Sequence, residues 1–419
     1  MTDRPHRGGS FAVLRHRDFA IFWSAALVSN TGSWMQSIAV PFVIYEMTHS
    51  TVWLGFAAFM NFVPAMLVGP FAGSLADRYP RKRILLVTQT IMMISAFSLW
   101  AVWATGVATP WLIVGICFAT GFVSGLNITT WQAFVTQLVG PTELVDAVRL
   151  NSMQFMGARA FGPALAGVVL QAFGPSTAFF ANGVSFLLVL LALFMIRPRT
   201  QAFSTGGGRV LAHYLEGLRV VRGSRALLLP VLMIGVVSLL GTSVIQLAPA
   251  VAKSVFEVGR GAYGLLVAAF GVGAVVGSVL VATVADRVRR SVAATAGSVG
   301  LATGIVVLGF APRYGVGVAA MFVMGASYLF VATSVNTGVQ AKVSDEYRGR
   351  VMSIYLSSLL LGVPVGALIQ GKLAAALGLR EVIVGSGLLW LAFLGWAMLR
   401  FDRLRPLDEQ RITTEPEPA

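Results

Sequence analysis

Arg159 is the only charged residue well inside any long apolar run of this 419-residue chain. Because an isolated arginine at that depth is costly, it should face an aqueous cavity or a polar partner. A guanidinium stays charged at physiological pH, so its chemistry would be electrostatic: it would attract an anionic or electron-rich group, or repel a cation. Its partners would be carbonyls, water, a ligand, or amides such as Gln132 and Gln154. The alternative is a structural pairing with carbonyls near a kinked helix.

The 17 acidic residues all lie at the ends of apolar runs, in loops or in tails. Glu46, at the end of the first run, is the nearest candidate for a proton site, and the alternative is a solvated charge at the membrane interface. No metal or cofactor is expected, because Cys117 is the single cysteine and the four histidines fall at or outside the ends of the runs. We find no nucleotide-binding motif, which argues against direct use of ATP.

The elements that must position these residues are membrane-spanning helices. The chain is 56% hydrophobic with a mean hydropathy of +0.79, values typical of a polytopic membrane protein. Its formal net charge of +14 indicates loops that face anionic lipid, and no nucleic acid partner is expected. The pattern predicts an all-α membrane protein with twelve transmembrane helices in two pseudo-symmetric six-helix bundles. The expected spans are approximately 19–46, 51–76, 83–106, 110–138, 147–172, 175–197, 226–252, 260–285, 290–311, 315–341, 350–376 and 380–402.

Lysine and arginine gather on the side of the N-terminus, which predicts that both termini are cytoplasmic. The opposite side carries only Lys253, Arg260, Arg313, Lys372 and Arg380. The N-terminal arm is basic and leads into a full-length span without a small-residue cleavage site, so no removable signal peptide is expected.

The two halves of the chain repeat one another. Asp77-Arg78 after the second span returns as Asp286-Arg287 after the eighth, and Pro163 of span five returns as Pro364 of span eleven. The predicted domains are an arm at 1–18, bundles at 19–197 and 226–402, a linker at 198–225 and a tail at 403–419. The spacing of apolar residues between Arg209 and Arg222 predicts a helix on the membrane surface, and the polar tail is predicted to be disordered. Gly273 and Gly277 are interpreted as a G-x-x-x-G helix-packing face.

A short, highly charged loop separates the second and third spans, with the sequence Gly-Ser-Leu-Ala-Asp-Arg-Tyr-Pro-Arg-Lys-Arg at 73–83. A loop this short predicts a tight turn between two membrane helices. It resembles the signature loop of the major facilitator superfamily, G-x-L-A-D-R-x-G-R-K, with Pro80 in place of the usual glycine. The resemblance implies a gating or conformational role for Gly73, Asp77, Arg78, Arg81 and Lys82, and for Asp286 and Arg287 in the second half.

Span five contains a segment that resembles the antiporter motif of the same superfamily, which is associated with exporters. The matching residues are Gly157, Gly162, Pro163 and Gly167. A proline frees a backbone carbonyl and kinks a helix, and glycines allow close packing. The alternative is a packing kink with no bearing on the direction of transport.

The segments at 11–19 and 34–36 resemble the bacterial branch of the superfamily that contains macrolide-efflux and enterobactin-export proteins. The resemblance implies a monomeric secondary transporter in the cell membrane, not an enzyme, that exports an amphiphilic small molecule by alternating access with protons as the coupling ion. The alternatives are an importer or facilitator of a metabolite, or a receptor or scaffold that does not transport. In the superfamily fold, spans one, four, seven and ten line a central cavity, which implies the cavity candidates Trp34, Gln36, Trp131, Gln132, Gln246 and Asn336, together with Arg159.

Overall fold

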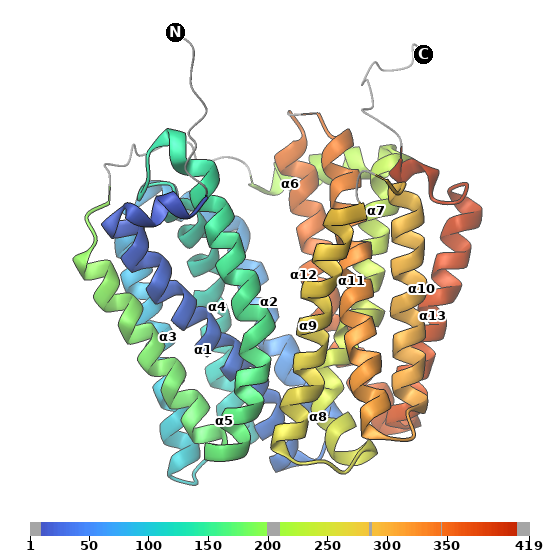
Figure 1. Ribbon diagram of the computed structural model, residues 1–419, viewed down its shortest axis with the longest axis horizontal. Coiled ribbons are helices and arrows are strands. Elements are labelled where there is room, and N and C mark those ends of the chain that lie inside the picture. Colours follow the sequence, from blue (N-terminus) through green and yellow to red (C-terminus); the bar gives the residue numbers. More distant parts are fainter. Residues whose placement is uncertain (1–9, 199–209, 285–286, 345, 409–419) are drawn as a thin grey trace. The chain divides into compact units, whose positions relative to one another are not determined.

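The structure, a computed structural model, describes residues 10–198, 210–284, 287–344 and 346–408. Within these ranges every regular element is helical and no strand is present (Figure 1). The long helices are α1 (Arg17–Thr48), α2 (Thr51–Arg78), α3 (Arg81–Ala104), α4 (Pro110–Val135), α5 (Leu144–Met195), α9 (Arg260–Val284), α10 (Arg290–Phe310), α11 (Tyr314–Lys342), α12 (Arg348–Leu377) and α13 (Leu379–Arg400).

The predicted number of membrane spans is confirmed. In the described part of the chain, ten helical segments are long and apolar enough to cross a membrane. One of them, α5, is interrupted at Gly174, whose φ of 78° breaks the helical path just before Pro175, so α5 comprises the predicted spans five and six. The 32-residue helix α1 supplies the first span.

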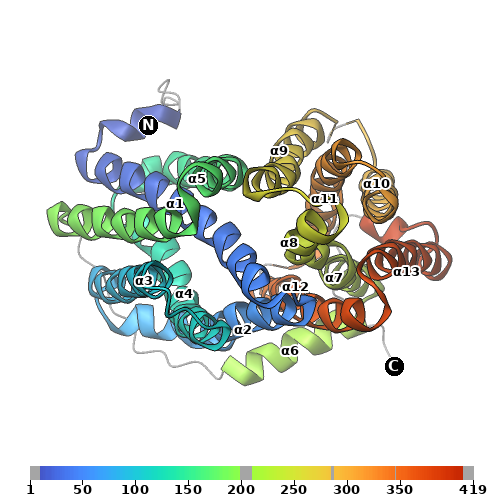
Figure 2. The ribbon, with the colours of Figure 1, turned by 90° about the horizontal axis from the view of Figure 1, so that it is seen from below.

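The helices form two compact units, the first made of Met1–Val40 with Pro64–Gly208 and the second of Pro41–Val63 with Arg209–Ala419. In the first unit α3 packs against α4 and α5, and in the second α11 packs against both α9 and α10 (Figure 2). The end of α1 and the beginning of α2 therefore belong to the second unit, although they come early in the sequence.

An apolar core holds the first unit together. Val13 of the short helix η1 (Ser10–Arg15) is buried there with Phe19 and Phe22 of α1 and with Phe134 of α4. The ring centroids of Phe22 and Trp131 are 4.3 Å apart. Val13 of the predicted arm is thus packed in the core of the bundle.

The seventh span is irregular. The sequence predicts one helix over 226–252, but the structure has α7 (Arg225–Val236), the π-helix η3 (Val237–Gly241), the 3-10 helix η4 (Thr242–Leu247), α8 (Ala248–Ala250) and the π-helix η5 (Val251–Val255). Pro249 has no N–H to donate within this stretch. The side-chain amide of Gln370 on α12 donates to the carbonyls of Leu239 and Leu240, at 3.0 and 3.2 Å. A side chain from another helix thereby satisfies backbone groups in the irregular segment.

In the described part of the chain, the end of the linker and the beginning of the tail both pack on the second unit. The predicted linker helix is present as α6 (Val210–Gly223), where Glu216 forms an ion pair of 2.6 Å with Arg350 of α12. The prediction of a disordered tail is wrong for residues 404–408. Leu404 and Leu407 are fully buried, and Asp408 accepts a hydrogen bond of 3.0 Å from the backbone N–H of Ser291 in the first turn of α10. An acid at that position satisfies a helix N-terminus.

The predicted glycine packing face on α9 is confirmed. A Cβ at Gly273 would overlap the carbonyl oxygen of Phe322, and one at Gly277 would overlap that of Ala326. Both neighbours belong to α11, so the absence of side chains is what lets the two helices approach this closely.

Candidate functional site

Trp34 lies where α1 packs closely against α5. The guanidinium carbon of Arg159 is 5.6 Å from the Trp34 ring centroid, and the Phe155 ring meets the indole edge-on at 6.5 Å. A Cβ at Gly162 would overlap the Cβ of Trp34. Two predicted site residues, Trp34 and Arg159, are thereby brought into contact, and Gly162 of the antiporter-like segment permits it.

The partner of Arg159 differs in kind from those considered in the sequence. The structure gives it the face of an indole ring, a cation–π arrangement, where the sequence suggested amides or carbonyls. The side chain is half-buried, so part of the guanidinium stays accessible. The i, i+4 spacing of Phe155 and Arg159 puts both side chains on one face of α5. This spacing is the sequence signal that an aromatic side chain such as Trp34 could pack against both.

Gln36 has a partner within its own unit. Its Oε1 accepts a hydrogen bond of 2.8 Å from Nδ2 of Asn182, in the second half of α5. Gly32 allows this approach, because a Cβ there would lie only 2.8 Å from the Ser185 hydroxyl. Gln36 therefore contributes to helix packing, and only part of its surface is left for a ligand.

The remaining cavity candidates are spread over both units. Trp131 packs against the apolar core and its indole N–H lies 3.5 Å from Oδ1 of Asn151, while Gln132 is exposed. In the second unit Gln246 is half-buried in η4, and Oδ1 of Asn336 accepts from the amide of Gln340 at 2.5 Å.

Glu46 forms an ion pair inside the second unit. Its Oε1 lies 3.0 Å from the guanidinium of Arg260 at the start of α9, and its buried Oε2 accepts no hydrogen bond from the described part of the chain. The guanidinium of Arg260 and the ammonium of Lys253 also lie 5.9 and 5.5 Å from the ring centroid of Phe42. The carboxylate of Glu46 therefore pairs with Arg260, and a second cation, Lys253, lies beside the same Phe42 ring.

The end of α1 and the beginning of α2 form a helical hairpin, Pro41–Val63, that belongs to the second unit. Contacts other than the Glu46 ion pair also hold this hairpin in the unit. The hydroxyls of Tyr45 and Ser254 are hydrogen-bonded at 2.5 Å, and Thr51 donates to the carbonyl of Gly371 at 2.8 Å. A Cβ at Gly55 would overlap the carbonyl of Ala367 on α12. The segment Pro41–Val63 is thus held by an ion pair at one end and by close helix packing at the other.

The charged loop between α2 and α3 is the tight turn that the sequence predicts. Only Tyr79 and Pro80 separate the two helices. The guanidinium of Arg81 donates to the carbonyl of Ala133 at 3.1 Å, and the ammonium of Lys82 donates to that of Ile196 at 2.7 Å. These carbonyls lie at the C-terminal ends of α4 and α5, where cations are favoured.

The other residues implied in gating are less defined. Arg78 and Arg287 are exposed. The surroundings of Gly73, the side chain of Asp77 and the whole of Asp286 lie outside what the structure describes.

Removal of the Lys82 ammonium is expected to weaken the first unit. Lys82→Met leaves the Ile196 carbonyl without this donor and should lower the free energy of unfolding by about 1 kcal/mol. Arg83→Met is the matched control, because the neighbouring Arg83 is exposed. The measurement is the melting temperature of each purified variant, and equal values for the two would contradict the proposed cap.

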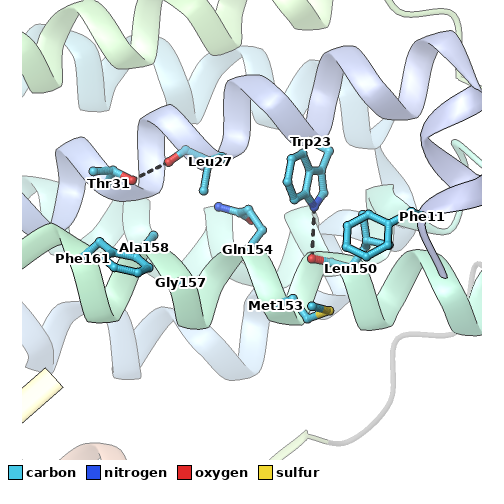
Figure 3. Close-up of a pocket in the computed structure, with 10 residues that line it drawn as sticks. All are labelled: Phe11, Trp23, Leu27, Thr31, Leu150, Met153, Gln154, Gly157, Ala158 and Phe161. Atoms are coloured by element: carbon cyan, nitrogen blue, oxygen red, sulfur yellow. Dashed lines mark hydrogen bonds between the residues drawn. The ribbon is translucent and has the colours of Figure 1, made fainter. Parts of the chain in front are cut away.

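A pocket of about 340 Å³ lies between η1, α1 and α5 in the first unit (Figure 3). Gly157 lines it, and a Cβ there would meet nothing within 4 Å. The two spaced glycines of the antiporter-like segment thus have different surroundings, since Gly162 packs against α1 while Gly157 borders open space. Pro163 and Gly167 are buried.

Comparison with known proteins identifies the family. A family model described as transmembrane secretion effector, within the major facilitator superfamily, matches residues 8–418. The chain belongs to the major facilitator superfamily. The chain is therefore a multi-pass membrane transporter, not an enzyme.

Curated members of the superfamily are similar to this chain over most of its length. The staphyloferrin A transporter of Staphylococcus aureus is 23% identical, over 85% of this chain and 90% of its own. The enterobactin exporter of Citrobacter koseri is 27% identical, over 94% and 95%. The macrolide efflux protein A of Streptococcus pyogenes is 22% identical, over 88% and 93%. The branch indicated by the sequence is confirmed.

A solved structure of the superfamily shares the fold. The bacterial homologue of the human lysosomal transporter Spinster, in an inward-facing and unoccupied conformation, superposes with a TM-score of 0.74 at 13% identity. The alignment covers 94% of this chain and 98% of that one, so the two chains share one fold over nearly their whole length.

Proposed function

We propose that the protein is a proton-driven exporter of an amphiphilic small molecule. Export is supported by the relatives named for enterobactin export and macrolide efflux. The observation that carries proton coupling is the ion pair between Glu46 and Arg260. Both termini are proposed to be cytoplasmic, from the distribution of lysine and arginine.

Glu46 is proposed as the proton site because its protonation would change a specific contact, the ion pair with Arg260. A carboxylate paired with Arg260 holds the end of α1 against α9. Protonation removes the negative charge, so the pair loses its attraction, and Arg260 and Lys253 are left as two cations beside Phe42. The packing of the Pro41–Val63 hairpin thereby depends on the protonation of Glu46. Other titratable groups near this end are His49, whose ring centroid is 6.0 Å from that of Tyr45, and the exposed Glu257.

The charged loop between α2 and α3, which resembles the superfamily's signature loop, is proposed to act in the conformational change of alternating access. Arg81 and Lys82 bind the carboxyl ends of α4 and α5, so a movement of α2 or α3 is transmitted to both helices. Asp77 and Asp286 are proposed as their acidic counterparts, on the strength of the resemblance alone.

The direct test is transport by the purified protein in liposomes. Radiolabelled erythromycin is chosen because one relative is a macrolide efflux protein. An imposed pH gradient should drive its movement, and the protonophore carbonyl cyanide m-chlorophenylhydrazone should stop it. Transport of erythromycin at the same rate with and without the pH gradient would contradict proton coupling. If no movement occurs, with siderophores also tested, export of this class of compound is contradicted.

Arg159 is proposed to select ligands by charge. Its half-exposed guanidinium beside Trp34 should attract an anionic or electron-rich group and disfavour a cation. Arg159→Gln should therefore shift transport toward ethidium, a cation, and away from the anion 8-anilino-1-naphthalenesulfonate. Arg159→Lys keeps the charge but loses the planar group that stacks on Trp34, and should retain partial transport of the anion. If Arg159→Gln transports both dyes like the unchanged protein at matched expression, Arg159 has only a structural role.

A further inference from the structure

Gln154 is a buried amide without a partner. The side chain is 2% exposed, and neither Nε2 nor Oε1 forms a hydrogen bond within the described part of the chain. Figure 3 shows it extending from α5 toward α1, between Leu27 and Trp23. An amide in such a place costs stability unless something else bonds to it.

The surroundings of this amide form a cavity without charge. None of the residues that border it is ionisable, and most are aromatic or aliphatic: Phe11, Trp23, Leu27, Thr31, Leu150, Met153, Gln154, Gly157, Ala158 and Phe161. The other polar side chains already have partners in the helix backbone. The Trp23 indole donates to the carbonyl of Leu150 at 3.1 Å, and the Thr31 hydroxyl donates to that of Leu27 at 2.8 Å. Gln154 is the pocket side chain whose donor and acceptor are both unused by the described part of the chain.

We propose that this pocket binds an uncharged amphiphile, with its apolar body against the aromatic walls and one amide-, amine- or hydroxyl-like group bonded to Gln154. The volume of 340 Å³ lies within the range of about 300–1,000 Å³ typical of sites for drug-sized ligands. A charged group is disfavoured, because a buried ion without a partner is costly. The identification of this ligand as cargo rests on the proposed export function, whereas its binding does not.

The neutral pocket and the cation of Arg159 have opposite preferences, which separates them by experiment. N-phenyl-1-naphthylamine is an uncharged aromatic amine whose fluorescence rises in apolar sites. The anion 8-anilino-1-naphthalenesulfonate has the same ring system with one sulfonate added. A pocket lined only by neutral groups should bind the first and reject the second, while a site formed by Arg159 should prefer the second.

The experiment measures equilibrium binding of both dyes to the full chain in lipid nanodiscs, after subtraction of nanodiscs without protein. The unchanged protein should bind N-phenyl-1-naphthylamine saturably. Gly157→Leu places a side chain in the open space of the pocket and should abolish that binding. Gly115→Leu, on α4, is the matched control because a Cβ there also meets nothing within 4 Å, and it should bind as before. Gln154→Leu should weaken binding by about three- to tenfold, through the loss of one or two neutral hydrogen bonds.

A second measurement reports on Gln154 without any ligand. If its amide is unpartnered in the empty protein, Gln154→Leu should raise the melting temperature while it weakens binding. If Gly157→Leu does not fold, the melting temperature and dye binding of Gln154→Leu test the proposal in its place.

Three results would overturn the proposal. The first is that the unchanged protein does not bind N-phenyl-1-naphthylamine saturably. The second is that all variants bind it equally, and the third is that Gln154→Leu leaves the melting temperature unchanged. A phospholipid that co-purifies with the unchanged protein and is lost from Gly157→Leu would identify an acyl chain as the occupant, and would overturn it as well. Transport of erythromycin remains a separate result, so failure of the pocket and failure of export are distinguishable.

Discussion

Glu46→Gln is expected to abolish the response of transport to a pH gradient. Glutamine keeps the size and a hydrogen-bonding oxygen but can neither be ionised nor take up a proton, so Arg260 loses its charged partner permanently. In liposomes the unchanged protein should move substrate faster when a gradient is imposed. The Gln variant should move it at one rate with and without the gradient, while exchange of labelled for unlabelled substrate continues.

The control for this experiment is Glu257→Gln. Glu257 is exposed and lies three residues before Arg260 in the sequence, so this variant removes the same charge near the start of α9. It should leave the gradient response intact. A second variant, Arg260→Gln, leaves the Glu46 carboxylate unpaired and should also alter the response. A Glu46→Gln protein that still accelerates under a gradient would exclude Glu46 as the proton site.

The membrane architecture could be predicted from sequence because it depends on local properties. Hydropathy identifies most of the spans, and the break at Gly174 falls where an otherwise continuous apolar stretch meets a glycine followed by a proline. The turn at Tyr79–Pro80 and the packing face at Gly273 and Gly277 are local as well, since each depends on a few neighbouring residue types.

The parts that could not be predicted depend on contacts between distant segments. The irregular seventh span is matched by an amide from α12, and the tail is held by Asp408 at the start of α10. Neither partner is visible within a window of sequence. The polarity of the tail suggested disorder, but Leu404 and Leu407 find a buried site on the second unit.

The sequence names the residues of the candidate site, but it does not indicate which of them contact one another. The rotation of α1 against α5 decides that Trp34 faces Arg159, that Gln36 faces Asn182, and that Gln154 faces a cavity. Hydrophobic periodicity could not fix this rotation, since membrane helices that pack on neighbours and also face lipid are apolar on all sides. Two glycines of span five indicate this rotation in the structure. Gly162 lies against Trp34 of α1, whereas Gly157 borders the pocket.

Gly162→Ala is expected to disrupt the first unit at the crossing of α1 and α5. The added Cβ would overlap the Cβ of Trp34, and neither atom can move by a change of rotamer, so one helix backbone must shift. Such overpacking costs about 1–3 kcal/mol, and it also displaces Trp34 from Arg159. We expect a lower melting temperature and loss of transport. Gly115→Ala, on α4 and outside the proposed sites, is the control, because its Cβ enters open space and alanine favours helix.

A pair of second-site changes tests the cause of this effect. Trp34→Ala removes the indole but keeps the Cβ, so Gly162→Ala should remain as costly in that background as in the unchanged protein. Trp34→Gly removes the Cβ itself, so in that background Gly162→Ala should cost little. The difference between the two double-mutant cycles, measured as melting temperature and folded yield, isolates the overlap of the two Cβ atoms from the loss of the aromatic ring. An equal cost of Gly162→Ala in both backgrounds would show that the glycine is required for a reason other than its contact with Trp34.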